Sequence, residues 1–237
     1  MKTAFIPLAA ALLAAALLAV SGYGARFGAW EYRFGFQLLR WSLYAGLAIA
    51  ALALVFLLIP RFRSGGVAVL AAAIAIAAGV AYVPSHWLQT ARAAAAINDV
   101  TTDTENPPAF VAVLPLRATA PVSAVYPGSA TANAQRSAYP DIVPLELPVP
   151  PAAAFARALD AAKAMGWEVA AADPATGRLE ATATTPWFGF RDDVVVRVAP
   201  TPTGSRIDVR SVSRVGKSDL GANAKRIRSF LARLGHA

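Results

Sequence analysis

Residues 184–230 read TTPWFGFRDDVVVRVAPTPTGSRIDVRSVSRVGKSDLGANAKRIRSF, and this stretch decides the fold of the C-terminal part of the chain. In 193–198 every second residue is a valine, at 194, 196 and 198, while Val195 and Arg197 point the other way, and in 206–211 charged residues alternate with Ile207 and Val209. This period of two is typical of strands lying with one face on a core. Between these runs Pro202 fixes one backbone angle and Gly204 permits a positive φ, so a tight turn is expected there. The two runs therefore predict an antiparallel hairpin.

Charge lies on one face of the second predicted strand. Arg206, Asp208 and Arg210 alternate with Ile207 and Val209, so one face is a charged ladder and the other is buried. Opposite charges that face each other on neighbouring strands contribute roughly 0.2–1 kcal/mol per pair. The ladder is therefore expected to stabilise the sheet through pairs with acidic residues.

A helix is expected to follow the hairpin. Ser218 and Asp219 favour a helix N-terminus, and Gly235 favours a helix end. Between them, apolar residues recur at helical spacing, at Leu220, Ala224, Ile227, Leu231 and Leu234.

A second helix and two further strands are expected upstream. Pro150 and Pro151 suit a first helical turn, and Gly166 suits its end. The strands begin near Trp167 and Leu179, on either side of a proline-glycine turn. The predicted fold class is an α-helical transmembrane N-terminal region of three helices followed by an α+β domain, in the order helix, four-stranded antiparallel sheet, helix.

The composition places the apolar excess at the front of the chain. The 237 residues are 57% hydrophobic and 15% charged, which is unusually apolar for a soluble domain. Up to Arg92 there are seven Lys or Arg against one Glu, and beyond it fifteen against thirteen Asp or Glu, so most of the net charge of +8 belongs to the N-terminal part. A basic surface on the C-terminal part is therefore not indicated, and no nucleic-acid partner is predicted.

Three apolar runs, at 4–20, 41–59 and 67–83, each approach the roughly 20 residues that a helix needs to cross a bilayer. For the first run, a cleaved signal peptide ending near Ser21 is the alternative. We expect a membrane domain with three helices at 1–92, then a proline-rich segment at 93–149 that we call the strap, and then the α+β domain at 150–237. The strap is expected to be partly docked on the α+β domain.

The distribution of Lys and Arg favours neither membrane orientation, because the positive-inside rule counts almost equal numbers of these residues on the two sides. The Met-Lys start is typical of a signal anchor and favours a cytoplasmic N-terminus, in which case three spans place the C-terminal domain in the periplasm.

The strap lies within residues 84–151, which hold eleven of the 17 prolines of the chain. An extended conformation is therefore expected for most of the strap. Its first part is rich in side chains that cap turns. Docking on the sheet is predicted for Asp99, Thr101, Thr102, Asp103 and Glu105, with the acids pairing with Arg206, Arg210 and Arg214.

The C-terminal part resembles the family catalogued as domain of unknown function 1499. The resemblance covers roughly 97–234, and its motifs are INDVTTDTENPPAF, YPDI, MGWE, TT-x-WFGF-x-DDVVVRV and GSRIDVRSVSRVGKSDLGANAKRIRSF. It implies no established activity. Its bacterial members look like envelope proteins that carry membrane helices, and its plant relatives look like plastid proteins, so the resemblance favours a domain outside the cytoplasm. With the three apolar runs, the prediction is a multi-pass protein of the bacterial inner membrane.

Motifs for known chemistry are absent from the sequence. The two histidines, His86 and His236, do not allow a histidine-based triad or an HExxH zinc site, and with no cysteine there is no thiolate chemistry. No cofactor and no catalytic residue are predicted, and a non-enzymatic role is favoured. A carboxylate-dependent or metal-dependent enzyme centred on Asp99, Asp103, Asp192 and Asp193 is the alternative, although these acids do not follow the EF-hand spacing.

The leading hypothesis is a membrane-anchored envelope protein whose periplasmic domain binds a partner protein or lipid. Its partners are then the lipid bilayer and an unidentified envelope protein or lipid. A hairpin tip with three aromatic side chains suits such binding. The predicted binding residues are Trp187, Phe188, Phe190, Arg191, Asp192, Asp193, Arg210, Arg214, Asp219 and Asn223. A third hypothesis is a carrier that holds an apolar ligand between helices and sheet, by analogy with the helix-grip folds of outer-membrane assembly lipoproteins.

Overall fold

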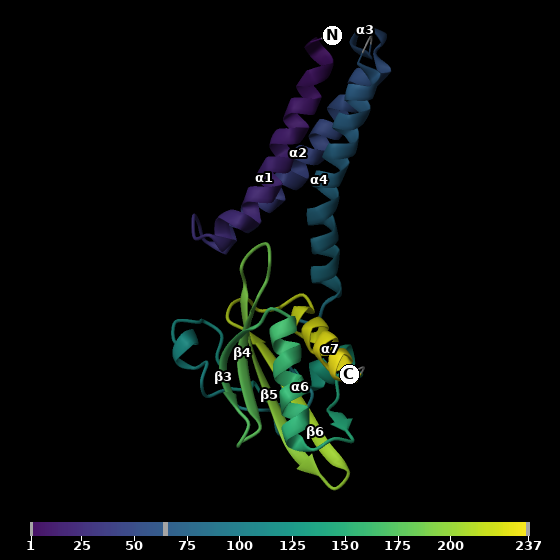
Figure 1. The fold of residues 1–237 in the computed structure, drawn as a ribbon. Coiled ribbons are helices and arrows are strands. Elements are labelled where there is room, and N and C mark those ends of the chain that lie inside the picture. Colours follow the sequence, from purple (N-terminus) through teal and green to yellow (C-terminus); the bar gives the residue numbers. More distant parts are fainter. Residues whose placement is uncertain (1, 64–65, 236–237) are drawn as a thin grey trace. The chain divides into compact units, whose positions relative to one another are not determined.

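The structure, a computed structural model, describes residues 2–63 and 66–235. The chain forms two compact units (Figure 1). The first contains the N-terminal helices up to Ala93 together with Pro186–Gly189, and the second contains Ala94–Thr185 and the chain from Phe190 onward.

The first unit is built from three long helices, α1 (Phe5–Arg26), α2 (Tyr32–Leu58) and α4 (Val67–Ala93), with short helices η1 (Lys2–Ala4) and α3 (Pro60–Arg63). All three long helices are long and apolar enough to cross a membrane, which confirms the prediction of three long apolar helices at the N-terminus. Even α1, with 22 residues, is about 33 Å long at 1.5 Å per residue, and a bilayer core is about 30 Å thick.

Small residues bring the long helices close together. A Cβ on Gly46 of α2 would lie 2.8 Å from the backbone oxygen of Ala77 in α4, and a Cβ on Gly35 would lie 2.4 Å from the backbone oxygen of Ser21 in α1. Close backbone approach at small residues is the usual way in which helices pack inside a bilayer.

The second unit is a sheet with helices. In chain order it contains β1 (Asp99–Thr101), η2 (Pro115–Arg117), α5 (Ser129–Ala138), β2 (Leu145–Leu147), α6 (Pro151–Ala164), β3 (Glu168–Asp173), β4 (Arg178–Thr184), β5 (Arg191–Thr201), β6 (Gly204–Ser213) and α7 (Ala222–Gly235). The strand order is β1-β6-β5-β4-β3, β2 also pairs with β6, and every pairing is antiparallel.

The predicted count of four strands is therefore too low, because the sheet has six. The two missed strands, β1 and β2, come from the strap and pair with the same edge of β6, at 210–212 and 205–207. Each has only three residues, which is too short to show a period of two in the sequence. The strap also contains helix α5, which its composition did not predict.

Helices α6 and α7 cover one face of the sheet (Figure 1). The main core lies there, with Val194, Val196 and Ile207 buried against α6 and α7. Trp167 stacks on Phe230 of α7 with ring centres 5.0 Å apart. We call this the helix face.

The opposite face, which we call the strap face, carries a second and smaller core. Phe110 and Val113 of the strap pack against Val195 of β5 and Val212 of β6. The strap thus buries this face of the sheet as the helices bury the other.

Two local features explain the chain path. Gly177, in the turn between β3 and β4, has φ +65° and a Cβ there would lie 2.1 Å from the backbone oxygen of Val198, so only glycine fits. Helix α7 begins at Ala222, two residues after the predicted stripe starts, because Leu220 has φ 55° and cannot continue a helix. Asp219 caps this turn by accepting hydrogen bonds from the backbone N–H groups of Gly221 and Asn223, at 2.8 and 2.7 Å.

Candidate functional site

The strap face brings together most of the acids and arginines that the sequence singled out. Antiparallel pairing aligns Thr182, Asp193, Val212 and Asp99 in one row across β4, β5, β6 and β1. Because side chains in such a row point to the same face, the pairing places Asp193 and Asp99 on either side of Val212.

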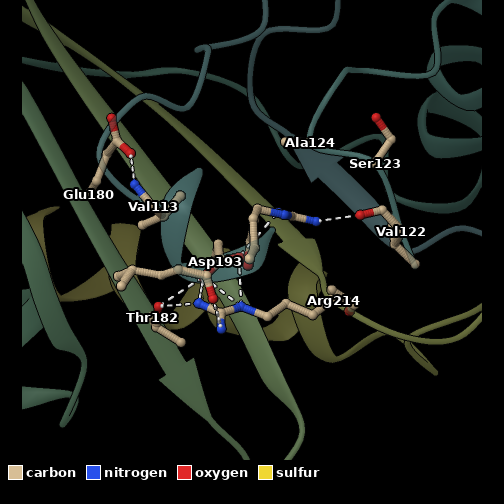
Figure 2. A network of polar contacts seen from close by, with 12 residues as sticks. Val113, Val122, Ser123, Ala124, Glu180, Thr182, Asp193 and Arg214 are labelled. Carbon is tan, nitrogen blue, oxygen red and sulfur yellow. Dashed lines mark hydrogen bonds and ion pairs between the residues drawn. The ribbon is translucent and has the colours of Figure 1, made fainter. Parts of the chain in front are cut away.

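Asp193 is fully buried and lies between two arginines. It accepts hydrogen bonds from Arg214 Nη2 at 2.8 Å, Arg214 Nε at 3.0 Å and Thr182 Oγ1 at 2.8 Å (Figure 2). Arg117 Nη1 lies 3.2 Å from Asp193 Oδ2, without hydrogen-bond geometry. Arg117 also donates to the backbone oxygen of Val122, so this buried arginine connects the strap to the sheet.

Burial lowers the pKa of the Arg117 guanidinium, with Asp193 opposing that shift and the nearby charges of Arg214 and Arg210 adding to it. One buried carboxylate is thus the ion-pair partner of two arginines that are themselves largely buried.

Asp99 and Arg210 form a second buried pair, in which each side chain is at most 2% exposed. Arg210 Nε donates to Oδ1 at 2.9 Å and Nη2 donates to Oδ2 at 2.7 Å, which is the bidentate geometry favoured by guanidinium and carboxylate. The guanidinium also lies 5.0 Å from the ring centre of Phe110 and 5.3 Å from that of Tyr126. Burial raises the pKa of Asp99, and the hydrogen bonds from Arg210 oppose that shift.

Glu180 of β4 is fully buried and holds the strap by its backbone. Its carboxylate accepts a hydrogen bond from the N–H of Val113 at 3.0 Å (Figure 2). It also accepts one from the N–H of Val111 at 2.9 Å. Arg178 lies 3.7 Å away. The arrangement fixes the position of the strap between its two apolar anchors, Phe110 and Val113.

The far end of the strap face contains a third cluster. Asp208 accepts from Arg197 Nη2 at 2.8 Å and from Arg206 Nε at 3.1 Å, and both arginines also contact Asp103 of the strap, at 3.2 and 2.9 Å. Asp103 further accepts a hydrogen bond from the backbone N–H of Asn106. Of the three arginines predicted to pair with strap acids, Arg206 contacts Asp103 and Arg210 contacts Asp99. The third, Arg214, contacts Asp193, which belongs to the sheet.

The remaining predicted strap residues make backbone or surface contacts. The side-chain amide of Gln135 in α5 makes two hydrogen bonds with the backbone of Thr101. Its Oε1 accepts from the Thr101 N–H at 2.9 Å, and its Nε2 donates to the Thr101 backbone oxygen at 2.6 Å. Thr102 Oγ1 accepts from the backbone N–H of Val209 at 2.9 Å. Glu105 pairs with Arg136 in a solvent-exposed position.

Three of the predicted binding residues lie on the helix face. Asp192 pairs with Arg226 of α7, and Asn223 Oδ1 accepts from Ser211 Oγ at 2.7 Å. Asp219 caps α7, and burial raises its pKa while the two backbone hydrogen bonds oppose that shift. Asp192 and Asp193 are neighbours in sequence but point to opposite faces, so they do not form one acidic site.

The aromatic tip, residues 186–189, belongs to the helical unit. Trp187 Nε1 donates to the backbone oxygen of Ala19 at 3.0 Å, and the Phe188 ring lies 5.1 Å from that of Phe36 and 5.6 Å from that of Trp87. Phe188 is buried and Trp187 is half-buried. A Cβ on Gly22 would lie 2.4 Å from the Trp187 ring, so the absence of a side chain at Gly22 makes room for that ring.

Two predicted residues border the tip without joining it. Phe190 is half-buried, and its backbone N–H donates to Thr185 Oγ1 at 2.9 Å, which closes the turn. Arg191 is exposed at the start of β5.

The sequence of the domain matches a known family. Residues 99–234 match the family described as protein of unknown function (DUF1499). The chain belongs to the DUF1499 family. No curated protein and no solved structure matches the chain.

The DUF1499 domain uses its carboxylates mainly to hold its own backbone and arginines. In the part of the chain that the structure describes, no three His, Asp or Glu side chains are grouped so that they can hold a metal ion. Sequence reasoning missed Arg117 and Glu180, which complete the network. Glu180 alternates with the inward-facing Leu179 and Ala181, so the sequence pattern places it on the opposite face of the strand. A glutamate on that face is ordinarily expected to be exposed, and nothing in the pattern indicates that the strap covers it.

We predict that replacing Asp99 by Asn destabilises the domain by about 3–5 kcal/mol, because the Arg210 charge is then buried without its partner. Replacing Asp141 by Asn is the control, since Asp141 pairs with Arg228 at an exposed position and such pairs contribute about 0–1 kcal/mol. Native-state hydrogen exchange of the β5 and β6 amides measures the free energy of opening in each variant.

The double variant Asp99→Leu, Arg210→Met is expected to recover most of the lost stability, because it leaves no uncompensated charge. If Asp99→Asn costs no more than Asp141→Asn, the buried pair does not support the domain.

Proposed function

We propose that the protein is a non-enzymatic, membrane-anchored binding module whose C-terminal domain binds anionic lipid headgroups. The observation that carries the proposal is an exposed apolar turn on the strap, at 111–117, in a domain whose buried acids are already engaged by arginines or backbone donors. A surface of this kind suits binding, since the groups that a carboxylate-dependent reaction would need are occupied.

The turn at 111–117 presents large aliphatic side chains to solvent. Val111, Leu114 and Leu116 are 57%, 44% and 58% exposed. The same segment is anchored beneath by Phe110 and Val113, so the exposed side chains stand on a fixed base. An exposed apolar patch on a held segment is typical of an interaction surface.

Charge and tethering favour lipid over a protein partner. Arg191 lies exposed on β5, and an arginine near an anionic membrane surface contributes about 1 kcal/mol of attraction. The domain begins at Ala94, directly after α4 ends at Ala93, so the connecting chain keeps the domain near a bilayer that holds α4. Such a tether raises the effective concentration of the bilayer surface.

The two other hypotheses have less support. A carboxylate-dependent enzyme needs free acids, whereas Asp99, Asp192 and Asp193 are buried in arginine pairs and Asp103 contacts two arginines. A carrier needs room between helices and sheet, whereas Phe155, Trp167 and Phe230 are buried in that layer.

For location we propose the inner membrane of a bacterium, with the C-terminal domain in the periplasm. The three apolar helices support a membrane location, and an odd number of spans places the C-terminal domain on the opposite side of the membrane from the N-terminus. The chain has no cysteine, so one cysteine introduced at the exposed Ala175 reports its side of the membrane.

A membrane-impermeant maleimide is expected to label Ala175→Cys in intact spheroplasts and to leave it unlabelled in sealed inverted vesicles. The opposite pattern places the domain in the cytoplasm. A cysteine at Ala232 of α7, also exposed, is the control for local reactivity and should show the same sidedness.

The lipid proposal is tested by hydrogen exchange of the full chain in nanodiscs. Amides of 110–117, apart from those of Val111 and Val113 that Glu180 already protects, are expected to exchange several-fold more slowly in discs that contain phosphatidylglycerol than in discs of phosphatidylcholine alone, because the turn is covered. The amides of Ala175 and Thr176, exposed residues in the turn between β3 and β4, serve as the internal control and should not change. Equal exchange at 110–117 in both lipids, with slowing only in native membranes, would identify a protein partner and overturn the lipid proposal.

A further inference from the structure

A small pocket opens on the strap face beside the exposed turn. It has a volume of about 120 Å³ and is lined by Leu116, Glu168, Val169, Ala170, Thr182, Arg191 and Arg214. That volume corresponds to about four water molecules, enough for one small polar group. The residues come from four strand regions and the strap, so the docked strap forms part of the pocket wall.

Positive charge is in excess at this pocket. Arg214 and Arg117 share the single carboxylate of Asp193, and the exposed fractions of the three side chains are 12%, 3% and 0%. Arg191 adds a third guanidinium, and its side chain makes no hydrogen bond or ion pair with the residues that the structure describes. Glu168 is exposed and is the one acid in the lining, which also holds Arg191 and Arg214. Counted with the adjoining buried pair Arg117 and Asp193, three arginines stand against two carboxylates.

The excess charge is held in place by the fold. Arg214 Nη1 donates to the backbone oxygen of Leu116 at 2.8 Å, while its Nε and Nη2 atoms are directed to Asp193 and Thr182. Nη1 keeps one N–H free of these contacts, and the Arg117 Nη1 group has no hydrogen-bond acceptor among the described residues. Two buried guanidinium groups that share one carboxylate leave a positive charge uncompensated, and an anion in the pocket would reduce the cost of burying that charge.

We infer that this pocket binds the phosphate group of an anionic ligand through Arg191 and Arg214. The inference rests on the proposed function, since Leu116 belongs both to the pocket and to the exposed apolar turn. Guanidinium groups recognise phosphate through paired N–H donors, and an apolar rim suits the glycerol and acyl part of a lipid. A lipid headgroup and a free phosphate share this chemistry.

The first arm of the test uses inorganic phosphate and the full chain in phosphatidylcholine nanodiscs, with binding measured by titration calorimetry. Replacing Arg191 by Gln is expected to weaken binding by about tenfold or more, since one charge-assisted contact is lost. Arg233→Gln, which removes the same charge from an exposed position on α7, should bind like the wild type. The side chain of Arg191 makes no hydrogen bond or ion pair with the described residues, so this substitution is expected to leave the fold intact, and exchange of the β5 amides verifies it.

The second arm counts phosphatidylglycerol molecules retained in native mass spectrometry and repeats the phosphate titration in discs containing that lipid. Retention that depends on Arg191, together with weaker phosphate binding in those discs, identifies the headgroup as the occupant. Phosphate binding that is unchanged by the lipid identifies a soluble phosphate ligand.

If neither phosphate binding nor lipid retention differs between the wild type and Arg191→Gln, the pocket is not an anion site. That result leaves the lipid proposal standing if 110–117 is still protected by phosphatidylglycerol. If phosphate binding depends on Arg191 but phosphatidylglycerol does not protect 110–117, the pocket is an anion site and the lipid proposal fails.

Discussion

Buried carboxylates on one face of the sheet are the constraint on which the rest of the domain depends. Asp99, Asp193, Glu180 and Asp208 are each at most 1% exposed, and a buried carboxylate is tolerated only when charged or hydrogen-bonding partners surround it. The strap supplies many of those partners, through Arg117 and the N–H groups of Val111 and Val113. The strap is for this reason part of the folded domain, although its proline content is typical of a linker.

The same constraint explains which groups remain available for function. Because the acids are engaged, the strap face presents to solvent mainly the groups that the pairing leaves over: aliphatic side chains at 111–117, the exposed Arg191 and a small pocket with excess positive charge. The aromatic tip at 186–189, which looks like an exposed binding element in the sequence, groups with the helices of the anchor. The features that suit a ligand are thus at the edge of the network and not at its centre.

Much of the fold was predictable from local sequence patterns, and most of the site was not. The apolar runs, the alternation in β5 and β6 and the stripe of α7 each span enough residues to show their period. The strands β1 and β2 have three residues each and form only because β6 offers them an edge. The roles of Glu180 and Arg117 depend on contacts between residues about 65 to 75 positions apart, which no periodicity reveals. Asp192 and Asp193 look like one acidic pair in the sequence, and strand geometry sends them to opposite faces.

Hydrogen exchange at Val111 and Val113 tests most directly whether buried carboxylates hold the strap on the sheet. In the wild type these two amides are expected to exchange nearly as slowly as those of β5. Replacing Glu180 by Gln should speed their exchange by about tenfold or more, since a hydrogen bond to a charged group contributes about 1.5–3 kcal/mol, while Glu146→Gln, at an exposed position of β2, should have no effect. If Val111 and Val113 already exchange in the wild type as fast as the exposed turn at Thr203, the strap is not held in this way, and the central role of the buried carboxylates is contradicted.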